Sequence, residues 1–190
     1  MTMENDLILQ NFDEGSDGML PTTSCSLPSS SGISSLPLVL DACCGPRGMW
    51  FDKQDSRTIF SDRREESHDT TRGIIKISPD VLADFTNLPF PDCSFWHVVL
   101  DPPHHTSKRM GESEGEVAKR YGRLTAGWPE MLQAGFEECF RVLRPNGTLI
   151  FKWCSSEIPI ADVLALTPKK PLYGHKSGKQ STTHWVAFIK

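Results

Sequence analysis

Long apolar runs are absent from this sequence, and no stretch approaches the roughly 20 consecutive apolar residues that a membrane-spanning helix needs. The N-terminus carries no basic region followed by an apolar run, so no secretory signal is predicted. Cys-x-x-Cys pairs are also absent, which argues against a zinc site of that type. With no export signal, all six cysteines are predicted to be reduced thiols in a cytoplasmic compartment, or alternatively a nuclear one.

Positive charge is missing from the first 40 residues, which carry five acids and neither lysine nor arginine. The whole chain carries −4, so the remainder carries +1. Acids are missing in turn after Asp162, where five lysines follow: Lys169, Lys170, Lys176, Lys179 and Lys190. A basic edge on a neutral body can accept a polyanion, although a solvated face with chance clustering accounts for the same pattern.

The segment TTSCSLPSSSGISSL, residues 22–36, is rich in Ser, Thr, Pro and Gly. It can bury too little apolar surface to offset the entropy of ordering it. We predict a disordered, acidic, Ser-rich leader over residues 1–36 and one folded domain over residues 37–190.

Short apolar runs follow, and four of them end in an aspartate: Asp41, Asp62, Asp84 and Asp101. A fifth run, TLIFKW, spans Thr148 to Trp153. Short, continuously apolar runs rich in Val, Ile and Phe are typical of strands buried on both faces of a parallel sheet.

Helix signals lie between and after these strands. Apolar residues from Trp128 to Leu143 recur at helical spacing, Pro129 suits a first turn, and Asn146-Gly147 suits a left-handed exit. Residues 158–166 predict a second, shorter helix, and the segments PLYGH and THWVAFIK predict two strands joined near Ser177-Gly178. The predicted fold is α/β: a doubly wound, Rossmann-like, mostly parallel seven-stranded sheet that ends in an antiparallel strand pair.

The strand-end acids suggest a nucleoside pocket, because ligands of such sheets bind beyond the carboxyl ends of the strands. Asp41 is followed by a tight turn with Gly45 and Gly48, where a ligand can approach the backbone closely. Asp62 lies 21 residues after Asp41, the offset at which such sites place an acid on a ribose. Asp84 with Phe85 can hold and cover an adenine, whereas a single aspartate is more often only a turn residue.

Three segments resemble class I S-adenosylmethionine (SAM)-dependent methyltransferases: LVLDACCG, ADFTNLPFPDCSF and FRVLRPNGTLIF. The resemblance implies SAM as the cofactor. It places Asp41, Cys43 and Gly45 at the methionine part, and Asp62 at the ribose hydroxyls. It also places Asp84 and Phe85 at the adenine. The competing NAD-type site fits less well, because no G-x-G-x-x-G follows the first strand.

Two positions depart from the family pattern. Cys43 stands where the family usually has its first loop glycine, and Arg47 stands where it has another.

The tetrapeptide DPPH, Asp101 to His104, resembles the [D/N/S]-P-P-[aromatic] motif of DPPY/W-type amino-methyltransferases of nucleic acids. An exocyclic amine is a weak nucleophile, because its lone pair is delocalised into the ring. The Asp101 side chain and the carbonyl of Pro102 can both accept its N–H groups and direct the lone pair at the methyl group. Pro102 and Pro103 fix the backbone and remove competing N–H donors. His104 occupies the position that normally stacks on a flipped base, such as an adenine that is to be methylated at N6.

A metal or general-base role for His104 and His105 is the alternative, but no third ligand is evident, so no metal is predicted. The polar stretch after the motif predicts a lid or substrate contact, in which Tyr121 and Trp128 can stack a base. Lys152, near the end of its strand, can reach the same crevice.

The sequence therefore predicts SAM-dependent methylation of an exocyclic amino nitrogen in nucleic acid, with RNA favoured over duplex DNA. A partner protein is a possible source of specificity, and no membrane contact is expected. Two alternatives stay open: a methyltransferase for a small molecule or protein, and a non-catalytic cofactor-binding scaffold.

Overall fold

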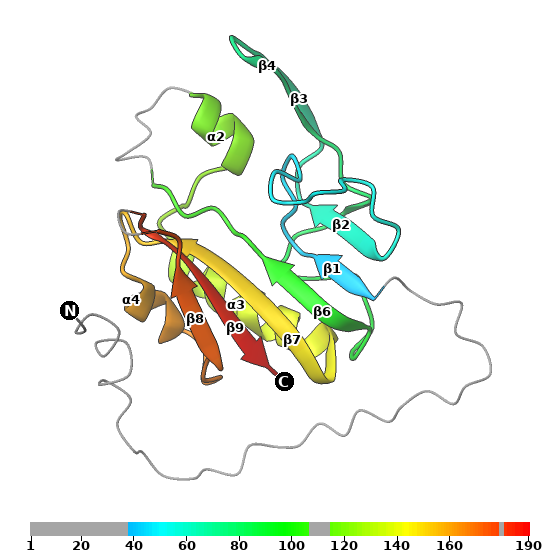
Figure 1. Ribbon diagram of the computed structural model, residues 1–190, viewed down its shortest axis with the longest axis vertical. Coiled ribbons are helices and arrows are strands. Elements are labelled where there is room, and N and C mark those ends of the chain that lie inside the picture. The colour runs from blue at the N-terminus through cyan, green and yellow to red at the C-terminus, as the bar shows by residue number, and fades with distance from the viewer. Residues whose placement is uncertain (1–37, 107–114, 179–180) are drawn as a thin grey trace.

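A seven-stranded sheet forms the centre of the computed structural model, which describes residues 38–106, 115–178 and 181–190. Its strand order is β5-β2-β1-β6-β7-β9-β8 (Figure 1). Parallel pairing joins β5 to β2, β2 to β1, β1 to β6 and β6 to β7, whereas β9 is antiparallel to both of its neighbours. The predicted mostly parallel seven-stranded sheet with a C-terminal antiparallel pair is confirmed.

The strands of this sheet are β1 (Val39–Asp41), β2 (Thr58–Asp62), β5 (Val81–Leu82), β6 (Phe95–Leu100), β7 (Leu143–Cys154), β8 (Tyr173–Lys176) and β9 (Thr183–Ile189). Each of the five predicted inner runs overlaps one of these strands. The helices are α2 (Glu116–Tyr121), α3 (Trp128–Val142) and α4 (Ile160–Leu164), so the shorter predicted helix is trimmed at both ends.

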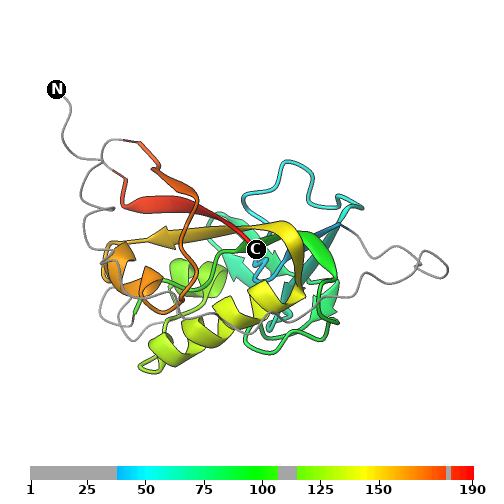
Figure 2. The same cartoon turned by 90° about the horizontal axis from the view of Figure 1, so that it is seen from below.

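Helices α3 and α4 cover one face of the sheet (Figure 2). Helix α3 buries Leu132, Phe136 and Cys139 against Phe151 and Trp153 of β7. Pro129 lies in its first turn, and Asn146 takes the left-handed conformation with φ +64° in the turn that leads into the inner part of β7. Burying such large apolar side chains is the main source of stability for this layer.

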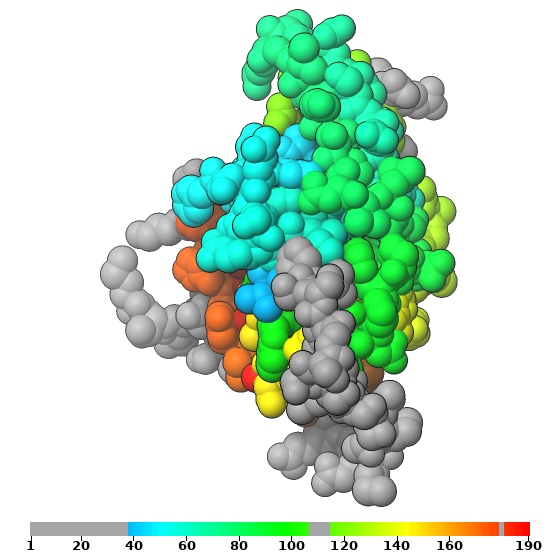
Figure 3. All heavy atoms as spheres, turned by 90° about the vertical axis from the view of Figure 1, so that its right-hand side faces the viewer, coloured from blue at the N-terminus to red at the C-terminus, as the bar shows by residue number. Residues whose placement is uncertain are grey.

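On the other face of the sheet, the described residues form no helix (Figure 2). The chain between β1 and β2 runs through turns, and the chain after β2 forms a separate hairpin of β3 (Glu66–Thr70) and β4 (Gly73–Ile77). This hairpin projects from the body of the molecule (Figure 3). The sequence did not predict it, because β3 has alternating partial exposure and no buried apolar run.

Cys93, in the loop before β6, is disulfide-bonded. The prediction that all six cysteines are reduced is therefore wrong at this position.

The proposed leader, residues 1–36, lies outside the described residues. Among the described residues, no helix has the length and apolar character to cross a membrane.

Candidate functional site

Three carboxylates gather at the carboxyl ends of neighbouring strands. Asp41 ends β1, Asp62 ends β2, and Asp101 directly follows β6. The parallel registers place these ends at one edge of the sheet, since Leu40 pairs with both Ile59 and Val98. The negative charges of Asp62 and Asp101 both act on Asp41. The sheet therefore brings three of the four predicted acids together, as parallel strand ends should.

Asp41 is completely buried and has no contact with solvent. Its carboxyl group accepts hydrogen bonds from the indole nitrogen of Trp50 at 2.7 Å and the backbone nitrogen of Cys43 at 3.3 Å. Burial raises the pKa of Asp41 to about 7, with the two neighbouring acids adding to the effect. Asp41 is therefore partly protonated near neutral pH, and it shapes the turn that follows β1.

Asp62 is also buried, and the chain itself occupies both of its oxygens. One oxygen accepts from the backbone nitrogen of Gly45 at 2.9 Å. The other accepts from the backbone nitrogen of Arg64 at 3.0 Å and faces the Arg64 guanidinium at 3.4 Å. A ribose hydroxyl can reach this carboxylate only if the Arg64 side chain moves aside.

The turn after β1 contains left-handed backbone at two positions, Gly45 with φ +49° and Arg47 with φ +55°. Arginine thus takes the conformation that usually favours glycine at the position where the methyltransferase pattern has one. The Arg47 side chain offsets the strain by bonding the carbonyls of Lys53 and Ser78, at 2.6 and 2.8 Å, and the Asp80 carboxylate at 2.8 Å. The loop keeps its shape without the expected glycine.

A cavity of about 320 Å³ opens beside these strand ends. Its lining comes from the turn after β1, from the Asp-Pro-Pro-His segment, from α2 and from β7: Cys43, Cys44, Gly45, Pro46, Gly48, Met49, Arg64, Asp101, Pro102, His104, Arg120, Tyr121 and Lys152. The volume lies in the range of small-ligand pockets. A larger cavity of about 710 Å³, next to β4, shares Gly45, Pro46, Gly48 and Arg120 with it.

Asp101 presents an unpaired acceptor at this cavity. One of its oxygens accepts from the Lys152 ammonium at 2.6 Å. Its other oxygen, Oδ1, is buried and lies 3.9 Å from Nδ1 of His104, which is too far for a hydrogen bond, and it has no hydrogen-bond partner among the described residues. A buried carboxylate oxygen without a partner is costly, and a bound ligand that supplies an N–H or O–H removes that cost.

The residues after Asp101 form a rigid wall. Pro102 lines the cavity, and Pro103 packs closely against Gly122, where an added Cβ would lie 3.2 Å from the proline ring. His104 is 9% exposed, and its Nδ1 bonds the Pro102 carbonyl at 3.1 Å. Burial lowers the pKa of His104, despite the opposing effect of Asp101, so its ring is neutral near pH 7.

The two residues predicted to stack on a base, Tyr121 and Trp128, lie in different parts of the structure. Tyr121 lines the cavity, with its ring centroid 6.4 Å from that of His104 and a tilt of 35°. Trp128 instead begins α3 and packs on the hydrophobic core. Residues 107–114 of the predicted lid lie outside the described residues.

The predicted adenine contacts, Asp84 and Phe85, do not line the cavity. Asp84 accepts two hydrogen bonds from Thr86 and lies 3.8 Å from the Arg63 guanidinium. Phe85 is only 3% exposed and packs against Gly135 of α3, so it presents almost no surface to a ligand.

The cavity thiol of Cys43 is not a nucleophile. Burial raises the pKa of Cys43 well above its usual value, and the surrounding acids raise it further. The thiol therefore stays protonated, and thiolate chemistry is excluded at neutral pH.

Two cavity residues, Arg64 and Arg120, were missed as site residues from the sequence. Their only sequence signal is basic charge near a strand end and within a short helix, a pattern common on solvated surfaces.

No family model and no curated protein matches this sequence. Several solved structures do. A Burkholderia thailandensis 1,6-didemethyltoxoflavin-N1-methyltransferase, bound to its substrate and S-adenosylhomocysteine, is 14% identical over 80% of this chain and 70% of its own, with a TM-score of 0.48. A Methanosarcina mazei SAM-dependent methyltransferase is 11% identical over 80% and 91% of the two chains, with a TM-score of 0.44. A Leishmania major SAM-dependent methyltransferase is 15% identical over 83% and 68%, with a TM-score of 0.45.

Proposed function

We propose that this chain is a SAM-dependent methyltransferase that methylates an exocyclic amino nitrogen of a base in nucleic acid, with RNA as the favoured substrate. The unpaired Oδ1 of Asp101 carries the proposal. It is a hydrogen-bond acceptor that the rest of the described chain leaves unused, next to a rigid diproline at the end of a central strand.

SAM supplies an electrophilic methyl group on a positively charged sulfur. The strand-end carboxylates Asp41, Asp62 and Asp101 favour a positive charge near them. The turn from Cys43 to Gly48 lines the same cavity, which matches the position that the family resemblance gives the methionine part. Arg64 and Arg120 also line it and can bind the carboxylate of that part.

Asp101 and Pro102 position the substrate amine in this proposal. Asp101 Oδ1 accepts one N–H, and the Pro102 carbonyl accepts the other through its second lone pair, since His104 uses only one. The amine lone pair then attacks the methyl carbon in line as the carbon–sulfur bond breaks, and the nitrogen releases its proton afterwards. Lys152 holds Asp101 in this orientation, which is a contribution of placement rather than of proton transfer.

The space between His104 and Tyr121 favours a flat substrate. Stacked bases lie about 3.4 Å apart, so a base between two rings needs about twice that distance. The two rings are 6.4 Å apart and tilted by 35°, so they must align and part slightly for a base to enter between them. A single-stranded or flipped base can enter such a slot, whereas a base inside a duplex cannot.

Basic side chains next to the slot favour a polyanionic substrate. Arg63 and Arg64 follow β2, and Lys119, Arg120 and Arg123 lie on α2 or just after it. We propose that these loops, or a partner protein, supply the specificity for the substrate.

The substrate is identified by incubating the full chain with methyl-labelled SAM and total RNA, DNA or small-metabolite fractions. We expect label in RNA, recovered after digestion as an N-methylated nucleoside and identified by mass spectrometry. Label only in small metabolites supports the small-molecule alternative. No label in any fraction, with SAM binding retained in calorimetry, supports the scaffold alternative.

Substitution of Asp101 tests the role of its unpaired oxygen, Oδ1. Asp101→Ala should lower turnover about 100-fold or more, because a transition-state hydrogen bond is removed, while SAM affinity falls much less, because Asp41 and Asp62 remain. Asp69→Ala, on the exposed strand β3, is the matched control and should behave as the wild type. Full turnover by Asp101→Ala would contradict amino methylation at this site.

A further inference from the structure

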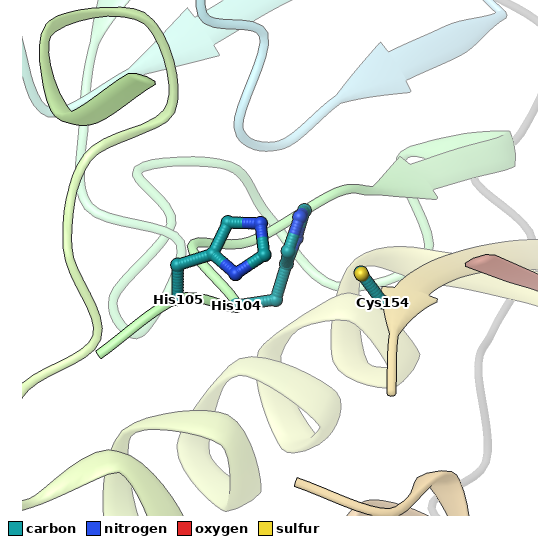
Figure 4. Close-up of side chains that lie close together, drawn as sticks. All are labelled: His104, His105 and Cys154. Atoms are coloured by element: carbon teal, nitrogen blue, oxygen red, sulfur yellow. The ribbon is translucent and has the colours of Figure 1, made fainter. Parts of the chain in front are cut away.

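Three side chains with metal-binding atoms lie close together near the carboxyl ends of β6 and β7: His104, His105 and Cys154 (Figure 4). One ligand atom from each lies within 4.8 Å of the others. The histidines follow β6 and the cysteine ends β7, so the parallel pairing of these strands brings together residues that are 50 positions apart. The prediction of no metal rested on the absence of a third ligand from the sequence, and Cys154 fills that position.

Both histidines have one ring nitrogen already fixed by the protein. Nδ1 of His104 bonds the Pro102 carbonyl at 3.1 Å, and Nδ1 of His105 bonds the Glu157 carboxylate at 3.2 Å. A backbone carbonyl and a carboxylate are the usual outer partners of metal-binding histidines, because they fix the tautomer with Nε2 as the lone-pair nitrogen. The network thus prepares both imidazoles to coordinate an ion through Nε2.

The surroundings of Cys154 suit a thiolate. Its sulfur lies 3.4 Å from the Ser156 hydroxyl and 3.2 Å from the Thr182 hydroxyl, and both hydroxyls can donate to it once it is ionised. Glu157 is held in turn by the backbone nitrogen of Thr106, at 3.2 Å to each oxygen. The cluster therefore has ordered outer contacts on all three ligands.

We propose that His104, His105 and Cys154 bind one Zn²⁺ ion, with water in the fourth position. Two imidazoles and one thiolate form a borderline-soft donor set of the kind that zinc prefers, and three protein ligands with one open position is a known zinc arrangement. Bond lengths of about 2.0–2.3 Å require the ligand atoms to approach to about 3.5 Å, so binding draws the cluster together by about 1 Å. His104 also lines the 320 Å³ cavity, which gives the ion an entry path.

Such an ion ties the end of β6 to the end of β7. It fixes the His104 ring, and through Nδ1 it fixes the Pro102 carbonyl at the cavity. The proposal concerns metal binding alone and does not depend on methyl transfer, so it can fail or hold separately from the proposed function.

Cobalt titration tests the site directly. We expect the chelator-treated full chain to bind one Co²⁺, to develop a near-ultraviolet thiolate-to-cobalt band, and to lose that band when Zn²⁺ is added. Cys154→Ser should remove the band, whereas Cys44→Ser, which changes a different cavity thiol, should keep it. A band that is absent from the wild type, kept by Cys154→Ser or lost in Cys44→Ser would overturn the proposal.

Two further variants separate coordination from a general loss of structure. Glu157→Gln changes an outer partner and should weaken Co²⁺ binding about 10–100-fold while keeping the band. His175→Ala, on the exposed strand β8, should leave the affinity unchanged. Zn²⁺ should raise the melting temperature of the wild type and of His175→Ala but not that of Cys154→Ser. Equal stabilisation of Cys154→Ser would also overturn the site.

Discussion

Asp41 links protonation to folding, because its carboxyl group is completely buried beside Asp62 and Asp101. Burial raises its pKa from 3.8 to about 7. Between these two pH values the unfolded chain has lost the proton and the folded chain still holds it. The folded state therefore binds more protons, and the free energy of unfolding falls as pH rises through this window.

Asp41→Asn should remove this pH dependence while keeping the acceptor for Trp50. The Asp41 contribution lost between pH 3.8 and about 7 is on the order of 4 kcal/mol. We expect the difference in unfolding free energy between variant and wild type to change by that order across the window, with the variant gaining as pH rises. Denaturant unfolding at several pH values measures it. Parallel pH profiles for the two proteins would show that Asp41 is already ionised when buried.

Arg47 stabilises the turn after β1 through its side chain, at the expense of a left-handed backbone. Arg47→Ala loses bonds to two carbonyls and to Asp80 but keeps the backbone strain. It should destabilise the chain by about 2–3 kcal/mol and weaken SAM binding, because the turn lines the cavity. Arg47→Gly loses the same bonds but relieves the strain, so it should be more stable than Arg47→Ala.

Thermal melting and calorimetry with SAM measure these effects. Arg57→Ala is the control, because that exposed side chain pairs with the nearby Asp55 at the surface and its loss should change little. The reverse order, with Arg47→Ala more stable than Arg47→Gly, would show that the left-handed conformation is not the source of the strain.

Helix α3 packs closely against the loop after β5 at Gly135, in addition to the hydrogen bonds that Glu138 and Arg141 make with that loop. A Cβ built at Gly135 would lie 2.6 Å from the Phe85 ring, far inside normal contact distance. The ring thus occupies the space above a glycine in the middle of the helix, where alanine would otherwise favour helix formation. This packing also accounts for the burial of Phe85 away from the cavity.

Gly135→Ala should destabilise the chain by about 1–2 kcal/mol, because overpacking against Phe85 exceeds the gain in helix propensity. Adding Phe85→Leu should recover part of the loss, which makes the two effects non-additive. Chemical denaturation of the single and double variants measures the coupling. Gln133→Ala, at an exposed position of the same helix, serves as the control. Stabilisation by Gly135→Ala alone would place the Phe85 ring elsewhere.

The strands β1, β2, β6, β7 and β9 and helix α3 could be predicted from the sequence because each buries a continuous or periodic set of apolar side chains. The polar hairpin β3–β4 could not, since none of β3 is buried.

Contacts between residues at the ends of neighbouring strands depend on the register of the strands, not on the local sequence. Leu100 pairs with Phe151, which places Asp101 opposite Lys152 and lets their side chains meet at 2.6 Å. Both residues are site candidates on sequence grounds, but only the register of β6 and β7 brings them together.

The same register explains what the sequence could not supply. His105, Glu157 and Cys154 carry no local pattern, and their proximity exists only because the ends of β6 and β7 are adjacent. The predicted ligands of the adenine, Asp84 and Phe85, follow a local motif, yet the packing of α3 decides where the ring points. Local sequence therefore predicts which strand end a residue occupies, and side-chain packing decides whether it faces the cavity.

Charge is unevenly divided over the whole molecule. The first 40 residues carry −5, and the remaining residues carry +1. Basic side chains from β2 and α2 lie at the cavity, among them Arg64 and Arg120. An acidic segment on the same chain can compete with the phosphate backbone of the proposed RNA substrate for such groups, and salt screens interactions of this kind beyond about 10 Å at 0.1 M.

Removing residues 1–36 should therefore tighten RNA binding several-fold at low salt, with the difference shrinking as salt rises. Fluorescence anisotropy with a labelled single-stranded RNA across a salt series measures it. The matched control keeps the length and replaces all five acids by their amides, at Glu4, Asp6, Asp13, Glu14 and Asp17. It should bind like the shortened chain, because charge rather than bulk is the cause. Weaker binding by both variants would instead assign the leader a direct role in holding the RNA.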